Sequence, residues 1–101
     1  MLRHLVMWKL KDFAEGYPKE ENALLLKHRL ETLPDHITEI RKVEAGINIL
    51  NHGSGNYDVV LEMHFDNEED LQSYQNHPKH LELGDWINNI RLERVAIDYN
   101  I

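Results

Sequence analysis

The chain has 101 residues, of which 42% are hydrophobic and 29% charged, as in one small globular domain. It has no cysteine, which excludes disulfide frameworks, thiol redox chemistry and cysteine-ligated metal centres. Its 11 basic and 18 acidic residues give a net charge of −7 without a long basic stretch, so we expect no nucleic-acid partner. We expect residues 1–101 to form a single domain.

The N-terminal run is rich in residues that favour β structure, and it predicts a strand over residues 2–11. Its apolar start faintly resembles a signal peptide, but Lys9 and Lys11 interrupt the run. No window holds the ~20 apolar residues that would span a bilayer. We therefore expect no membrane association and a cytoplasmic location.

A helix is predicted between Pro18, which suits a first helical position, and Pro34, which ends it. Its apolar residues recur at helical spacing on one face: Ala23, Leu26, Leu30 and Leu33. Two strands with alternating apolar residues follow over residues 40–50 and 57–65. The polar, glycine-containing residues 51–56 join them as a loop that allows an antiparallel return.

The second half of the chain repeats this order of helix and strand. Asp66 and Glu69 resemble a helix capping box and predict a helix that includes Tyr74. Pro78 breaks this helix and opens a second helical stretch that extends to Ile90. A strand with alternating apolar residues ends the chain: Val95, Ile97, Tyr99 and Ile101.

The order βαββαβ predicts an α+β, ferredoxin-like fold, a four-stranded antiparallel sheet with the helices on one face. The first and third strands are expected to be central, with the last strand beside the first. The other face stays bare and mixes apolar with charged side chains: Leu5, Met7, Val60, Arg3, Lys9, Asp58 and Glu62. Such a face favours a sheet-to-sheet homodimer, the alternative being a monomer with a mixed sheet surface.

Seven histidines are present, and those around Pro78 are the candidates for a site. A histidine just inside a short helix over a sheet can point between the layers, as we expect for His80 near Tyr74. If the last strand runs antiparallel to the first, His4 lies opposite Asp98, and both face the helices. The other histidines are interpreted as solvent-exposed (His28, His36 and His52) or as part of the dimer face (His64).

An imidazole poised near neutrality can remove a proton α to a carbonyl, and a phenol can hold the developing enolate. On this hypothesis His80, Tyr74 and Asp98 are catalytic. Structural roles are the alternative: a helix cap for His77, a buried ring for Tyr74 and a hydrogen-bonded core position for His80, with the same two readings open for His4. A pocket of ~300 Å³ or more reached by His80 would favour ligand binding, and a filled gap would favour the structural roles.

Three segments resemble the stress-responsive A/B barrel (Dabb) family: residues 3–11, the Tyr-x-x-His-Pro-x-His pattern of residues 74–80, and residues 97–99. The resemblance implies a dimeric α+β barrel. A more distant resemblance is to olivetolic acid cyclase, which closes a linear polyketide by intramolecular aldol condensation. It implies a general base at His80, a partner tyrosine at Tyr74, a pocket histidine at His4 and an acidic residue at Asp98. Val59 stands where the cyclase has another pocket histidine.

The sequence thus predicts a small-molecule-binding dimeric α+β barrel that acts on a small carbonyl or aromatic compound without a cofactor. It would be a cyclase-like or isomerase-like enzyme with His80 as general base. The candidate binding residues are His4, His77, Val59, Trp8 and Trp86. The alternative is a non-catalytic, stress-responsive structural or interaction dimer.

The residues give less support to two other functions. A metal site made of His77, His80 and Glu82 is not assigned, because this spacing straddles a helix start instead of lying on one helical face. A haem-degrading monooxygenase would share the barrel architecture, but no motif supports it.

Overall fold

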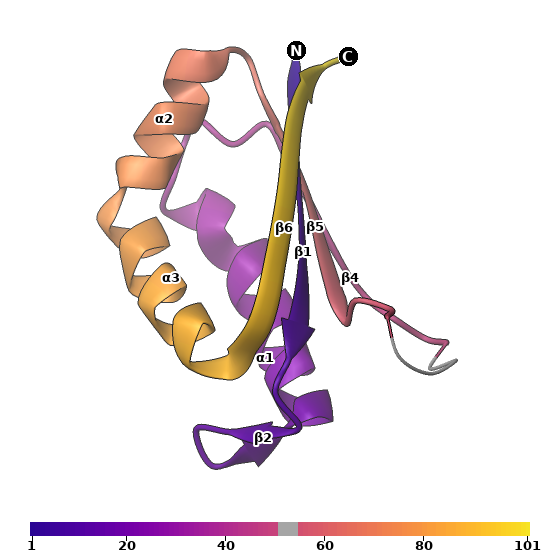
Figure 1. The fold of residues 1–101 in the computed structure, drawn as a ribbon. Helices are drawn as coiled ribbons and strands as arrows, with labels where there is room; N and C mark the ends of the chain where they lie inside the picture. The colour runs from indigo at the N-terminus through magenta and orange to yellow at the C-terminus, as the bar shows by residue number, and fades with distance from the viewer. Residues whose placement is uncertain (51–54) are drawn as a thin grey trace.

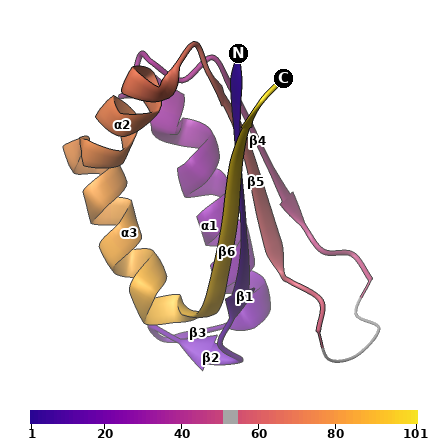
Figure 2. The same ribbon diagram turned by 45° about the horizontal axis from the view of Figure 1, so that its top comes forward.

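The structure, a computed structural model, describes residues 1–50 and 55–101. A four-stranded antiparallel sheet carries three helices on one face and leaves the other face bare (Figures 1 and 2). The strands lie in the order β4 (Lys42–Ile47), β5 (Val59–Phe65), β1 (Leu2–Leu10) and β6 (Arg91–Asn100). The predicted ferredoxin-like arrangement is confirmed, with β5 and β1 central and β6 beside β1.

The helices are α1 (Lys19–Thr32), α2 (Glu68–Asn76) and α3 (Pro78–Ile90). A 3-10 turn, η1 (Leu33–Asp35), continues α1, and a small hairpin of β2 (Phe13–Ala14) and β3 (Tyr17–Pro18) precedes it. None of the helices in residues 1–50 and 55–101 has the length and apolar character needed to cross a membrane.

The predicted boundaries need small corrections. The cap of α2 is Asn67, whose side chain accepts a hydrogen bond from the Asp70 backbone N–H at 2.8 Å, so the aspartate capping box predicted at Asp66 is wrong. Strand β6 begins at Arg91, four residues before the predicted start at Val95. Four residues of the predicted loop, 51–54, and with them His52, lie outside the described part of the chain.

The core lies between the sheet and the helices because alternate side chains of each strand point toward them. Strand β1 supplies Val6 and Trp8, and β5 supplies Leu61 and Met63, each at most 3% exposed. Helix α1 covers them with the apolar face that the sequence predicts, including the fully buried Leu26.

The face without helices, called the open face here, carries the opposite set of side chains. It is apolar near the middle of the sheet: Leu5, Met7, Val60, Val95 and Ile97 line one shallow hollow. Asp58 was expected on this face, but it precedes β5 and accepts a hydrogen bond from the Leu10 backbone N–H at 2.7 Å. Its carboxylate is thus held at the end of β1, while the residue lines a hollow together with Met7 and Val60 of the open face.

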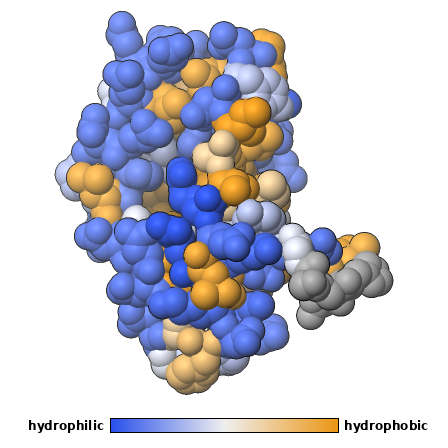
Figure 3. Space-filling view, viewed as in Figure 1, coloured by the Kyte–Doolittle hydropathy of each residue, from blue (hydrophilic) through white to orange (hydrophobic). Residues whose placement is uncertain are grey.

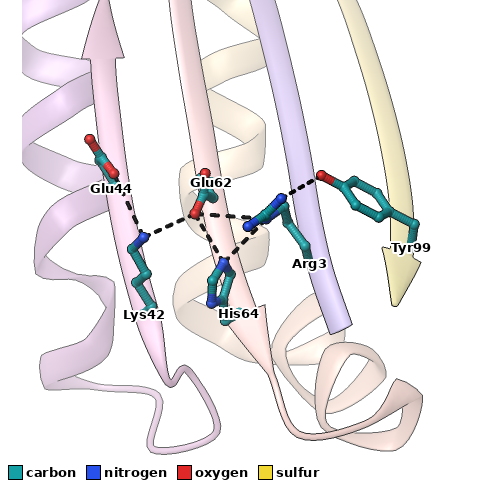
Figure 4. Close-up of polar contacts among 6 residues, drawn as sticks. All are labelled: Arg3, Lys42, Glu44, Glu62, His64 and Tyr99. Carbon is teal, nitrogen blue, oxygen red and sulfur yellow. Dashed lines mark hydrogen bonds and ion pairs between the residues drawn. The ribbon is translucent and has the colours of Figure 1, made fainter. Parts of the chain in front are cut away.

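A charged network lies beside this apolar region (Figure 4). Glu62 is its centre: it accepts a hydrogen bond from Lys42 at 3.1 Å, contacts His64 at 2.9 Å and lies 3.8 Å from Arg3. The hydrogen bond from Lys42 holds the pKa of Glu62 below its ordinary value. Arg3 also donates to the Tyr99 hydroxyl at 2.7 Å, so the network joins β4, β5, β1 and β6.

Candidate functional site

A cavity of about 210 Å³ opens between α3 and the sheet, and we call it the helix–sheet cavity. Its apolar lining includes Trp8 and Leu83. Its polar lining comes from four elements: His4, Tyr74, His80, Asn88, Arg91 and Arg94. The volume is below the ~300 Å³ of ordinary ligand pockets but above the ~150 Å³ of an apolar cavity that binds benzene. The cavity is therefore sized for one ring or a short chain.

His80 reaches the cavity because of how α3 begins. Pro78 is the first residue of the helix, and the His77 side chain caps it by accepting a hydrogen bond from the Lys79 backbone N–H at 3.1 Å. His80 then lies in the first turn, where its Nδ1 is 2.9 Å from the Gln75 carbonyl oxygen. A carbonyl only accepts, so Nδ1 carries the proton and Nε2 of the neutral ring keeps its lone pair. Burial lowers the pKa of His80, which favours this neutral form.

Tyr74 lies deepest among the aromatic residues of the site. Its side chain is 2% exposed, and its ring centroid is 4.5 Å from that of His80 and 5.2 Å from that of Phe65. Burial raises the pKa of the Tyr74 phenol, so the hydroxyl stays protonated and can donate. Within residues 1–50 and 55–101 that hydroxyl has no hydrogen-bond partner, and it is available to a guest in the cavity.

His4 and Asp98 face each other across β1 and β6, as the predicted antiparallel pairing requires. His4 is 3% exposed, and its Nδ1 contacts a carboxylate oxygen of Asp98. The His4 ring also lies edge-on to Tyr74, with centroids 6.2 Å apart. Asp98 therefore orients His4, and the described contacts place no carboxylate against His80.

Of the other predicted binding residues, one lines the cavity and three lie outside its lining. Trp8 lines the cavity, and its buried Nε1 has no hydrogen-bond partner among the described residues. His77 caps α3 and lies outside the lining, while Val59 is buried between β1 and β4 next to Trp8. The Trp86 ring packs under the Arg29 guanidinium, whose Cζ lies 4.1 Å from the ring centroid, and Trp86 is not part of the cavity lining.

His77, His80 and Glu82, from which the sequence analysis assigned no metal site, are placed as follows. No three His, Cys, Asp or Glu side chains in the described part of the chain are arranged to hold a metal ion. His77 uses its Nδ1 as a helix cap, and His80 uses its Nδ1 on a backbone carbonyl.

Sequence reasoning missed Arg94 and Gly84, which both line the cavity. Arg94 shares the helix-facing row of β6 with Asp98, so strand alternation alone could have identified it. In the space-filling view the most hydrophilic side chains of this face gather where α3 faces β6 (Figure 3). For Gly84, the only signal was a glycine inside a predicted helix.

The sequence model of the stress responsive A/B barrel domain family matches residues 2–101. A dimeric protein of unknown function and ferredoxin-like fold from Bacteroides fragilis is 31% identical, with 99% of this chain and 95% of that chain covered and a TM-score of 0.80. A dimeric ferredoxin-like protein of unknown function from Thermobifida fusca is 25% identical, with 99% and 90% covered and a TM-score of 0.81. A comparison with curated proteins found no match.

Enzymes also share the fold. A hydroxynitrile lyase from Passiflora edulis has a TM-score of 0.81 at 16% identity, with 99% of this chain and 92% of that chain covered. An identity this low shows a common architecture and carries no activity over to this chain.

Proposed function

We propose that this chain, which belongs to the stress-responsive A/B barrel domain family, binds a small carbonyl or aromatic compound in the helix–sheet cavity and acts on it with His80 as general base. The reaction class would be cyclase-like or isomerase-like. The observation that carries the proposal is the pair of His80 and Tyr74 at this cavity. Their ring centroids are 4.5 Å apart, the lowered pKa of His80 favours the neutral imidazole, and the raised pKa of Tyr74 keeps its phenol protonated.

The pair suits removal of a proton next to a carbonyl group. Nε2 of His80 would take the proton from the α-carbon, and the electron pair of the broken C–H bond would move onto the carbonyl oxygen. The Tyr74 hydroxyl would donate a hydrogen bond to that oxygen as it becomes negative. Return of a proton from the imidazolium to carbon completes an isomerisation. Alternatively, the enolate carbon would attack a second carbonyl carbon and close a ring, and the imidazolium would give its proton to the alkoxide that forms on that carbonyl oxygen.

Gly84 supports a cavity that is kept open for a guest. A glycine inside a helix destabilises it by roughly 0.5–1 kcal/mol relative to alanine. Gly84 has no positive φ that would demand glycine, and an added Cβ would meet no atom of residues 1–50 and 55–101 within 4 Å. Packing therefore does not explain why position 84 is a glycine. Its position in the cavity lining does, because a larger side chain there would take up space in the cavity.

The proposal includes a homodimer formed through the open face. Met7 and Ile97 are 40% and 60% exposed there, an arrangement that a partner sheet would bury. The similar proteins from Bacteroides fragilis and Thermobifida fusca are described as dimeric. The cytoplasmic location expected from the sequence stays a prediction.

The test of the catalytic part is hydrogen–deuterium exchange at the α-carbon of small ketones in D₂O, followed by proton NMR. Cyclohexanone, which is neutral, and levulinate, which is an anion, cover both ligand charges. We expect exchange of at least one ketone above the buffer rate, and at least a tenfold loss in His80→Gln. His36→Gln is the matched control, because His36 is exposed and lies away from the cavity.

The alternative, a non-catalytic structural or interaction dimer, is favoured by one observation: the cavity volume of about 210 Å³ is below the usual ligand range. The same experiment decides between the two. Exchange of both ketones at the buffer rate, or an equal rate in the His80→Gln variant, would discard the catalytic proposal and leave the dimer.

A further inference from the structure

We propose that the ligand of the helix–sheet cavity carries a carboxylate group and that Arg94 binds it. This inference rests on the proposed function for the existence of a ligand and goes beyond it in naming the ligand's charge. Arg94 lies on the helix-facing row of β6, opposite Trp8 on β1, and lines the cavity together with His4 and His80.

Arg94 differs in its surroundings from arginines that hydrogen-bond to other side chains, and also from Arg29, which has no ion pair with the described residues but stacks on the Trp86 ring. Among residues 1–50 and 55–101 the Arg94 guanidinium has no ion pair and no hydrogen bond. By comparison, Arg41 pairs with Asp66 at 2.9 Å, and Arg91 donates to Asn88 at 3.0 Å. Arg94 is exposed at the opening of the cavity and is available to a ligand.

The charge balance of the cavity is opposite to that of the whole protein. The chain has a net charge of −7, yet no aspartate or glutamate is part of the described lining. Asp98, the acidic residue nearest along the same row of β6, is held by His4. The strongly hydrophilic patch of Figure 3 lies over this region. An anionic ligand would neutralise the positive charge at the opening.

The chemistry of arginine favours a carboxylate over a neutral oxygen. The guanidinium presents parallel N–H groups that match the two oxygens of a carboxylate. Its charge also reaches the reacting groups, since Arg94 contributes to lowering the pKa of His80 and opposes the rise in the pKa of Tyr74.

The strand register sets the length of the ligand. Trp8 and His4 are four residues apart on β1, so their Cα atoms are about 13 Å apart along the strand. A carboxylate near Trp8 and Arg94 and a carbonyl near Tyr74 and His80 would then be separated by only a few bonds once the long arginine side chain extends. A cavity of about 210 Å³ accommodates such a short keto acid.

The experiment compares levulinate with levulinamide, which has the same shape and the same ketone but no charge. Dissociation constants are measured by NMR titration for the wild-type protein, Arg94→Gln, Arg94→Lys and the control Arg41→Gln. We expect the wild type to bind levulinate about tenfold or more tightly than levulinamide. Arg94→Gln should remove this preference by weakening levulinate alone. Arg94→Lys should keep part of it, and Arg41→Gln all of it.

Equal affinity of the wild type for both probes, equal weakening of both by Arg94→Gln, or binding of neither at millimolar concentration would overturn the inference. Thermal unfolding of each variant checks that it is folded. The exchange assay separates this result from the proposed function. If levulinate binds in an Arg94-dependent way but no His80-dependent exchange occurs, the anion site is supported and the role of His80 as general base is discarded. If His80-dependent exchange occurs but both probes bind equally well, the general base is supported and the anion site is discarded.

Discussion

The carboxylate of Asp98 contacts Nδ1 of His4, its direct register partner across β1 and β6. This contact satisfies a histidine that is 3% exposed, and it fixes which ring nitrogen faces the strand and which is left for the cavity. The pair thus ties the closing strand to the edge of the candidate site. Asp98 is a positioning residue in this arrangement, acting through His4.

Asp98→Asn is expected to destabilise the fold and to loosen the His4 ring. It replaces a charged acceptor with a neutral amide of the same shape. Because Asp98 is partly exposed, we expect a loss of about 1.5 kcal/mol, at the low end for a hydrogen bond to a charged group. Urea unfolding measures the loss, and the ¹⁵N shifts of the His4 ring report its tautomer. Asp85→Asn, an exposed change on α3, should alter neither; an equal effect would contradict the role of Asp98.

Gly84→Ala is expected to stabilise the protein and weaken ligand binding at once. The added methyl group fits without a close contact and improves helix propensity, so the free energy of unfolding should rise by roughly 0.5–1 kcal/mol. The same methyl group enters the cavity, so levulinate should bind more weakly, and Gly84→Leu should abolish binding. Urea unfolding and NMR titration measure the two effects. Unchanged binding in Gly84→Leu would show that the ligand lies elsewhere.

The order of elements was predictable from the sequence because it depends on local signals. Alternating apolar residues identify β5, the helical spacing that includes Leu26 identifies α1, and Pro78 separates α2 from α3. The cap of α2 was misplaced by one residue, since Asp66 and Asn67 are both good caps and only the backbone geometry chooses between them.

The site was predictable only in part. The positions of His80 and Tyr74 followed from the proline and the helix, and the pairing of His4 with Asp98 followed from strand parity. The partner of His80 did not, because the Gln75 carbonyl is a backbone group that no side-chain pattern reveals. That Arg94 has no ion pair with the residues the structure describes depends on which side chains lie near it in space, and a sequence does not display this.

The stability of the fold should depend on the protonation of His80. Burial lowers its pKa in the folded protein below the ordinary 6.5, so between these two values the unfolded chain binds the proton and the folded chain does not. Stability contributed by His80 is therefore present above pH 6.5 and is lost as the pH falls toward the lowered value.

Urea unfolding is compared at about pH 5 and about pH 7.5, on either side of the ordinary histidine pKa of 6.5. We expect His80→Gln to lose less stability than the wild type between the higher and the lower pH. His36→Gln, which changes an exposed histidine, should behave like the wild type. If all three proteins lose the same amount, the burial of His80 does not control its protonation.

The dimer proposal makes a prediction with a closely matched control. Ile97 lies on the open face and is 60% exposed in the single chain, whereas Leu24 lies on α1 and is 62% exposed. Ile97→Glu would place a charge between the two sheets, and burying a charge without a dedicated partner is costly. We therefore expect it to give a monomer of 12.0 kDa in equilibrium sedimentation at micromolar concentration, while Leu24→Glu stays a dimer.

Because both side chains are exposed in the isolated chain, neither change should unfold it, and circular dichroism checks this. A wild-type monomer, or a dimer that survives Ile97→Glu, would exclude the open face as the interface.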